Sequence, residues 1–381
     1  MGRSPVRCAL VIAILALLPA VPAVAEPVPV WQGVWAGTVG TLPVRACLAR
    51  RGEDGAVGSY FYLSRLRPIR LEQQGGSTTW VEGFESSSGP PQPRWTFGTV
   101  TAEVLAGEWR DGARRLPFRL TRVPGASGDE PCGSRLFNVP RLRPLRLTTT
   151  PARKDGVTYT KLAYDVGPAF EAVTLESFAL ASDDAAIRRV NARLRAPVAQ
   201  EAARSDWFEC MAGQLNQTGN DGDFDVTIEP AMITRRWLAV TESNGGSCGG
   251  AHPYTSVTSL TFDLATGAAV DLNGWLNERA LERRRYPDDK EPIVTVRAAL
   301  RRVILVHDRE SEAECRSSAA DAEFWDIGLT RRGLQFTPSL AHVEQGCENP
   351  TVVPWAALTP WLSAAGRAGR ASMLAGDRSG S

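Results

Sequence analysis

The chain from Trp31 to about Val123 consists of short runs in which apolar and polar residues alternate. In the run Leu116–Thr121, every second residue is apolar, which is the pattern of a half-buried strand. Clusters of glycine, proline or serine separate the other runs of this kind, which are Val57–Leu63, Pro68–Glu72, Thr78–Phe84, Arg94–Val100 and Val104–Arg110. Seven or eight strands without a helix predict a small antiparallel β-barrel or β-sandwich.

Five tryptophans of this first part invite two interpretations. Core bulk is the simpler one, since large aromatic side chains fill small β-barrels; an aromatic-lined groove for a sugar is the alternative. The residues concerned are Trp31, Trp35, Trp80, Trp95 and Trp109.

After about residue 145 helical and strand patterns mix, which predicts an α+β domain with helices packed on an antiparallel sheet. Asp183 or Asp184 is placed to cap a helix with Ile187, Val190 and Leu194 on its inner face. A second helix is expected to begin around Glu291–Pro292 and to bury Ile293, Val296, Leu300 and Val303. Predicted strands are Phe224–Ile228, Trp237–Glu242, Thr258–Asp263, Ala268–Leu272, Phe324–Leu329 and Leu334–Thr337.

These patterns divide the chain into five segments. We expect a cleaved signal peptide at residues 1–25, an all-β domain at 26–124, a linker with Cys132 at 125–144, the α+β domain at 145–363 and a disordered tail of small and polar residues at 364–381.

The first 25 residues have the three parts of a secretory signal. Arg3 and Arg7 precede the apolar run Cys8–Leu18, and Ala23-Val24-Ala25 is a small-x-small cleavage site. Cleavage leaves 356 residues with 41 basic and 42 acidic side chains and no further membrane span. The sequence therefore predicts a periplasmic or secreted protein of nearly neutral charge, which argues against a general nucleic-acid binder.

Removal of Cys8 leaves an even number of cysteines, six, in an exported chain. Such a count predicts three disulfides, and six cysteines allow 15 pairings. Proximity along the expected domains favours the pairs Cys47–Cys132, Cys210–Cys248 and Cys315–Cys347, which we state as a hypothesis. The spacing of the cysteines does not fit a zinc site, and no metal or other cofactor is expected.

Two charged segments have both a functional and a plain interpretation. Between Arg110 and Arg153 ten arginines face three acidic residues, which suits an anionic glycan or lipid; however, the chain has 40 Arg and 3 Lys, so the surplus also follows from a general preference for arginine. The acidic segment Asp221–Asp225 lacks the glycine and glutamate positions of a helix-loop-helix calcium loop and is interpreted as a turn entering a strand.

The segment Gly245–Pro253, with the sequence GGSCGGAHP, is the most distinctive motif and is expected to form a loop between two strands. Its four glycines permit a sharp or crowded bend. Four roles are open: Cys248 as a nucleophile with His252 as base, a metal site joining His252 to His307 and His342 or to nearby carboxylates, a buried or capping histidine that hydrogen-bonds the loop, and a ligand-contacting loop. The candidate ligand-binding residues are Gly249, Gly250, His252, Pro253 and Tyr254.

From this loop onward the chain resembles the RsiV-like C-terminal domain family. The motif GGAHP is followed by the strand and turn Leu260–Gly267, by Val270–Leu272 and by Trp275-Leu276, and the match continues through Gly333–Phe336 and Val352–Trp355. The resemblance spans about residues 145 to 362, and departs from the family in carrying Cys248, His342 and Cys347. This family forms the extracellular end of the anti-sigma factor RsiV and occurs in the peptidoglycan deacetylase PdaC outside its catalytic domain. In RsiV this domain is similar to a receptor that binds lysozyme. The resemblance therefore implies a recognition surface and not a catalytic site.

The resemblance and the predicted export favour a non-catalytic binding module of the bacterial cell envelope that recognises lysozyme or peptidoglycan. An envelope hydrolase or esterase is the first alternative, although a G-x-S-x-G elbow, an H-E-x-x-H motif and a glycine-rich phosphate loop are all missing from the sequence. A structural component of an envelope complex is the second alternative.

Overall fold

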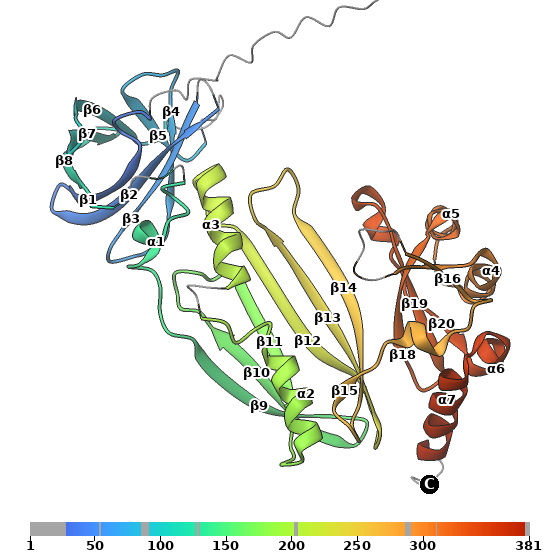
Figure 1. The fold of residues 1–381 in the computed structure, drawn as a ribbon. Coiled ribbons are helices and arrows are strands. Elements are labelled where there is room, and N and C mark those ends of the chain that lie inside the picture. Colours follow the sequence, from blue (N-terminus) through green and yellow to red (C-terminus); the bar gives the residue numbers. More distant parts are fainter. Residues whose placement is uncertain are drawn as a thin grey trace, which may run out of the picture.

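The structure is a computed structural model that describes residues 28–52, 55–84, 91–125, 128, 130–201, 205–285, 290, 292–309 and 311–377. The expected signal peptide lies outside these described residues. Figure 1 shows three parts that follow one another: a barrel, a long curved sheet and a smaller C-terminal part. The architecture is α+β, as the sequence predicts.

The first part is a closed barrel of eight antiparallel strands, which confirms the barrel alternative of the prediction. Consecutive strands form hairpins, and β1 closes the barrel by pairing with β8. The strands are β1 (Gly33–Val39), β2 (Leu42–Arg51), β3 (Gly55–Tyr62), β4 (Ile69–Gln73), β5 (Thr79–Glu82), β6 (Arg94–Val100), β7 (Val104–Asp111) and β8 (Arg114–Arg122). Of the alternating residues in β8, Phe118 and Leu120 are buried in the interior.

The barrel is filled by aromatic side chains around one carboxylate. Trp35, Trp80, Trp95 and Trp109 are buried, and Trp31 packs edge-on against Trp80 with ring centroids 5.4 Å apart. These tryptophans therefore act as core.

Glu82 is the polar centre of this aromatic core, with only 9% of its surface exposed. Its Oε1 accepts hydrogen bonds from the Tyr60 hydroxyl at 2.7 Å and from the indole N–H groups of Trp95 at 3.0 Å and Trp109 at 2.6 Å. Burial, followed by the nearby Glu82 carboxylate, raises the pKa of Tyr60 far above its usual value. One carboxylate oxygen thus satisfies three donors that would otherwise be unpaired in the core.

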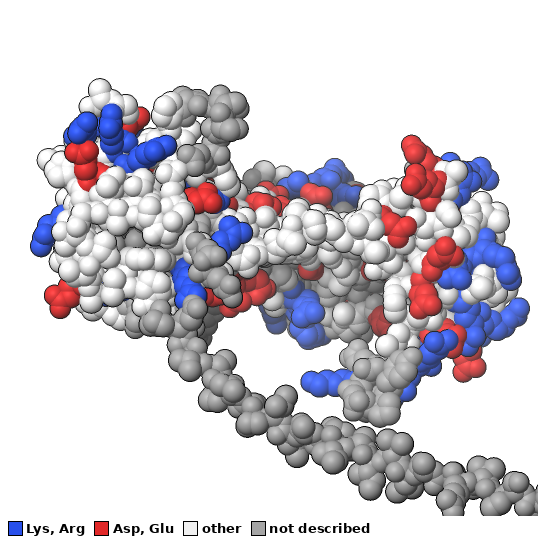
Figure 2. All heavy atoms as spheres, turned by 90° about the horizontal axis from the view of Figure 1, so that it is seen from above, with Lys and Arg blue, Asp and Glu red and all other residues white. Residues whose placement is uncertain are grey.

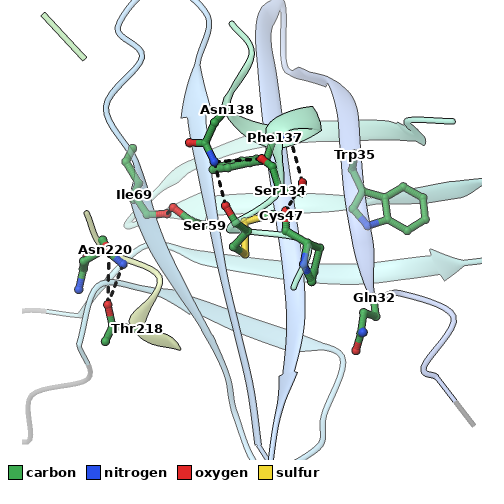
Figure 3. The surroundings of a disulfide bond; sticks show 12 residues. Gln32, Trp35, Cys47, Ser59, Ile69, Ser134, Phe137, Asn138, Thr218 and Asn220 are labelled. Atoms are coloured by element: carbon green, nitrogen blue, oxygen red, sulfur yellow. Dashed lines mark hydrogen bonds between the residues drawn. A yellow bond between two sulfur atoms is a disulfide. The ribbon is translucent and has the colours of Figure 1, made fainter. Parts of the chain in front are cut away.

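A short helix, α1 (Arg135–Asn138), and the Cys47–Cys132 disulfide attach the connecting segment to the barrel (Figure 3). Ser134 caps the helix by accepting from the Phe137 N–H, and the Phe137 ring packs against Phe61. Together with Leu215 of the next part, these residues form a small apolar cluster between the barrel and the sheet.

The arginine-rich segment is partly structural. Arg122 donates to the carbonyl oxygens of Val30, Gln32 and Ala102, and its guanidinium lies 4.2 Å from the centre of the Trp35 ring. Figure 2 shows basic and acidic side chains interspersed on the face seen from above. Arg122 of this segment therefore has a structural role in the barrel.

Arg141 connects the barrel to the rest of the chain and is fully buried. Its guanidinium donates to the Leu66 carbonyl at 3.0 Å on the barrel side and to the Ala169 carbonyl at 2.9 Å on the sheet side, and forms an ion pair with Asp221. The Asn138 side chain accepts a further hydrogen bond at 2.9 Å. The acidic segment around Asp221 therefore has a structural partner.

The second part is a seven-stranded sheet in the order β15-β14-β13-β12-β11-β10-β9. All neighbours are antiparallel except β11 and β12, which run parallel, so the expectation of a purely antiparallel sheet is corrected at this pair. The reason is the connection: helices α2 and α3 lie between β11 and β12 in the chain, and such a crossover permits parallel strands. The strands are β9 (Arg146–Lys154), β10 (Val157–Asp165), β11 (Val173–Leu180), β12 (Asp223–Ile233), β13 (Trp237–Ser247), β14 (Tyr254–Asp263) and β15 (Ala268–Ala269).

Helices α2 (Ala185–Arg195) and α3 (Asp206–Thr218) cover one face of this sheet (Figure 1). Asp184 caps α2, and Val190 and Leu194 are buried, as predicted. Gly219 ends α3 with φ +75°, and a Cβ there would lie 2.4 Å from the Gly58 carbonyl oxygen. Glycine is therefore required for the close approach of α3 to the barrel.

The third part packs helices around a small three-stranded sheet of β18 (Phe324–Leu329), β19 (Gly333–Ser339) and β20 (Thr351–Pro354). Its other elements are the hairpin β16 (Leu281–Arg284) and β17 (Ile293–Val296), helices α4 (Ala298–His307), α5 (Ala313–Asp321), α6 (Trp355–Leu358) and α7 (Ala364–Asp377), and the 3-10 helices η2 (Leu272–Trp275), η3 (His342–Cys347) and η4 (Thr359–Trp361).

Two predictions for this part are wrong. The run Ile293–Val296 forms β17, and α4 begins only at Ala298, because consecutive β-branched residues favour a strand that pairs with β16. Residues 364–377 form α7 instead of a disordered tail. Their small side chains permit close packing: a Cβ on Gly369 would lie 2.4 Å from the Trp275 ring, and Met373 is buried.

Candidate functional site

The distinctive glycine-rich segment lies at the end of the β13–β14 hairpin. Gly245, Gly246 and Ser247 belong to β13, so the loop itself is shorter than predicted and spans residues 248–253. Gly249 is buried with φ +97°, and a Cβ there would lie 2.9 Å from the Gly213 carbonyl oxygen. Gly250 is exposed and has more room. Crowding therefore demands glycine at Gly249 and also at Gly246, where a Cβ would lie 2.6 Å from the Asp223 carbonyl oxygen.

A disulfide between Cys248 and Cys210 ties this loop to α3. All three disulfides have the predicted pairing. Because its sulfur is bonded to Cys210, Cys248 is not a thiolate nucleophile in this state. The interpretation of Cys248 and His252 as a nucleophile and base therefore fails.

His252 is exposed, so the interpretation of it as a buried histidine is wrong. Its ring lies beside that of His342 on η3, with centroids 5.3 Å apart and a tilt of 31°. The amide oxygen of neighbouring Gln345 accepts a hydrogen bond from His342 Nδ1 at 3.1 Å, and its amide N–H donates to the Thr255 carbonyl at 3.3 Å. The second disulfide of this region, Cys315–Cys347, holds η3 to α5.

The third histidine of the chain does not join this pair. His307 Nδ1 lies 2.9 Å from the Val303 carbonyl oxygen within α4. Over the part of the chain that the structure describes, no group of three or more His, Cys, Asp or Glu side chains is arranged to hold a metal ion. Within the described ranges, the contact of His252 with His342 therefore lacks a third side chain that could complete a metal site.

Tyr254 follows the loop and leaves 39% of its surface exposed. Partial burial of the side chain raises the pKa of its hydroxyl, and the negative charges of Asp206 and Asp223 raise this pKa further. Pro253 is exposed beside it. On the neighbouring η3, Val343 is 90% exposed. We call His252, Pro253, Tyr254, His342 and Val343 the loop surface.

A groove of about 350 Å³ extends from the loop surface along β14 toward β18 and β19. Val257 and Phe324 line it and are 53% and 48% exposed. Asp326 accepts a hydrogen bond from the Ser259 N–H at 3.0 Å, and burial raises the pKa of its carboxyl. Glu348 adds a second carboxylate, and the described lining residues include no lysine, arginine or histidine.

The sequence did not indicate this groove, because its walls come from segments some seventy residues apart. One local signal existed, because Asp326 interrupts the apolar strand Phe324–Leu329. A carboxylate within such a run needs a hydrogen-bond donor when it is buried. Its partner is the Ser259 backbone, which sequence periodicity does not identify.

We expect removal of the Cys210–Cys248 disulfide to loosen the loop. The double variant Cys210→Ala/Cys248→Ala should lose about 2–4 kcal/mol of stability in denaturant unfolding. Amide hydrogen exchange should accelerate at residues 248–253, while the loop held by Cys315–Cys347 should remain as in the parent. An unchanged exchange rate in residues 248–253 would show that backbone packing alone orders the loop.

Comparison with known proteins gives a distant structural match. A member of the DUF3298 family, the RsiV-like domain family, from Bacteroides fragilis aligns with a TM-score of 0.35 and 12% identity, over 59% of this chain and 95% of that one. A DUF3298 family protein from Pseudomonas aeruginosa PAO1 aligns with a TM-score of 0.31 and 11% identity, over 58% of this chain and 96% of that one. No protein-family model and no curated protein matches.

Proposed function

We propose that the protein is a non-catalytic binding module outside the cytoplasm that recognises a cell-wall-related partner, c-type lysozyme or peptidoglycan, through the loop surface. The single observation that carries the proposal is the exposure of His252, Pro253 and Tyr254 on and directly after a loop fixed by the Cys210–Cys248 disulfide. The sequence resemblance to the RsiV-like domain supplies the class of partner.

Location outside the cytoplasm is supported by the three disulfides, which persist in oxidising compartments. Within the residues described, no helix is long and apolar enough to cross a membrane.

A fixed and exposed loop favours recognition. Tyrosine contributes a large contact area with few rotatable bonds, and large exposed apolar side chains such as Val343 mark interaction surfaces. The two disulfides on either side, Cys210–Cys248 and Cys315–Cys347, limit the conformational entropy that binding would cost. The loop surface is thus organised before a partner arrives.

A binding measurement with mature protein, residues 26–381, tests the proposal. Immobilised c-type lysozyme in biolayer interferometry and sedimentation with purified peptidoglycan are the two arms, at micromolar protein. We expect binding in at least one arm and an approximately tenfold or greater loss of affinity in the variant Tyr254→Ala, as for an exposed aromatic anchor.

Leu42→Ala is the matched control, because Leu42 is 44% exposed on the barrel, away from the loop surface. It should bind as the parent does. Equal losses in both variants, or no binding in either arm, would contradict the proposal. Release of acetate or muropeptides by the pure protein would favour the hydrolase or esterase alternative instead.

A further inference from the structure

The outer edge of β14 is largely unpaired. On its inner side β14 pairs with β13 over ten residues, whereas on its outer side β15 covers only Phe262 and Asp263. The Thr261 carbonyl, which accepts from the Val270 N–H at 2.8 Å, points outward. Because backbone groups alternate between the two edges of a strand, those of Thr255, Val257 and Ser259 point outward as well.

Side chains from other elements hydrogen-bond the outward backbone groups of Thr255 and Ser259, but not those of Val257 between them. Asp326 accepts from the Ser259 N–H, and Gln345 donates to the Thr255 carbonyl. Between them, the outward N–H and C=O of Val257 have no partner in the described ranges. An open strand edge of this kind is a template for another strand.

The groove beside this edge has room for another strand, and its mostly polar walls include the exposed apolar side chains of Val257 and Phe324. Its volume of about 350 Å³ is within the size range of ligand pockets, and Val257 and Phe324 are about half exposed along it. Strand addition uses such an arrangement: backbone hydrogen bonds provide affinity and side-chain pockets provide selectivity.

The negative charge of the groove favours a positively charged occupant. Asp326 and Glu348 line it, and the lining residues that the structure describes carry no positive charge. A partly buried carboxylate is stabilised by a cationic side chain that hydrogen-bonds to it. A basic segment therefore complements the groove, and an acidic one would be repelled.

We propose that β14 is a docking edge for an extended segment of a partner protein, which adds as a strand beside Val257 and places a lysine or arginine side chain near Asp326. This inference rests on the proposed function, since it describes how a polypeptide partner of the adjoining loop surface is held.

The direct test uses synthetic peptides with the mature protein. The probe is the capped peptide Thr-Val-Lys-Val-Thr; one control has its lysine amide N-methylated, and another has glutamate in place of lysine. NMR titration should show binding of the probe with the largest amide shifts at Val257 and Ser259, and each control should bind at least about tenfold more weakly. Equal binding of the three peptides, or no shift at these amides at millimolar probe, would overturn the inference.

Two protein variants complement the peptides. Val257→Pro removes the outward N–H at an edge position where proline is tolerated, and should abolish probe binding, whereas Val257→Thr keeps that N–H and should bind within about threefold of the parent. Asp326→Asn should reduce the preference for lysine over glutamate. A preference unchanged in Asp326→Asn would contradict the assigned role of the carboxylate.

The outcomes separate the two proposals. If lysozyme binds and its binding depends on Tyr254 but is unchanged in Val257→Pro, the docking edge fails and the proposed function stands. If the lysine peptide binds at Val257 while lysozyme and peptidoglycan do not, the proposed function fails and the docking edge stands.

Discussion

Replacement of Arg141 by alanine is expected to be among the most destabilising single substitutions in the described part of the chain. Its side chain is fully buried, and its removal strips Asp221 of its ion-pair partner. Burial raises the pKa of Asp221 and lowers the pKa of Arg141, and their mutual attraction opposes both shifts. Breaking such a pair on one side costs about 3–5 kcal/mol, which denaturant unfolding would measure.

Arg143→Ala is the control for this substitution, because the Arg143 side chain is exposed and bonds only to nearby carbonyl oxygens. It should change stability by less than about 0.5 kcal/mol. The double variant Arg141→Met/Asp221→Asn, which leaves no unpaired buried charge, should recover part of the loss. A loss equal to that of Arg143→Ala would mean that Arg141 does not couple the barrel to the sheet.

Replacement of Glu82 by alanine should destabilise the barrel by a comparable amount. Tyr60, Trp95 and Trp109 all donate to one oxygen of this carboxylate and would be left without an acceptor in the core. Each unsatisfied buried donor costs about 1–3 kcal/mol. The change should appear as an earlier unfolding transition in tryptophan fluorescence, since two of the three donors are indoles.

Glu82→Gln is the informative comparison, because its amide retains an acceptor oxygen at nearly the same position. We expect it to keep most of the stability that alanine loses. If glutamine and alanine destabilise equally, the negative charge of Glu82, and not its capacity to accept three hydrogen bonds, stabilises the core.

The barrel was predictable because each of its strands and turns has a pattern that can be recognised within a few neighbouring residues. Alternation in runs such as Leu116–Thr121 encodes which side chains enter the core, and the turns between runs carry their own signals. The disulfide pairing was predictable because each pair lies within a stretch that folds together, with partners separated by 32 to 85 positions in the sequence.

Other features depend on contacts that periodicity does not record. Helix α7 was missed because its glycines and alanines look like a tail until the Trp275 ring that packs on them is placed. Helix α3 was missed as well, although Ser205 is a recognisable cap. In the candidate site, the glycines were sufficient to locate the loop. The contact of His252 with His342 was not predictable, because it depends on how the β13–β14 hairpin and η3 meet.

Hydrogen exchange of the mature protein, measured with and without its partner, shows where on the protein the partner binds. With saturating c-type lysozyme or peptidoglycan fragments, we expect slower exchange in residues 248–254 and 342–347, where the loop surface lies, and unchanged exchange in the barrel strands at residues 33–122. Protection confined to the barrel, or no protection with either partner, would contradict the claim that the loop surface is the recognition site.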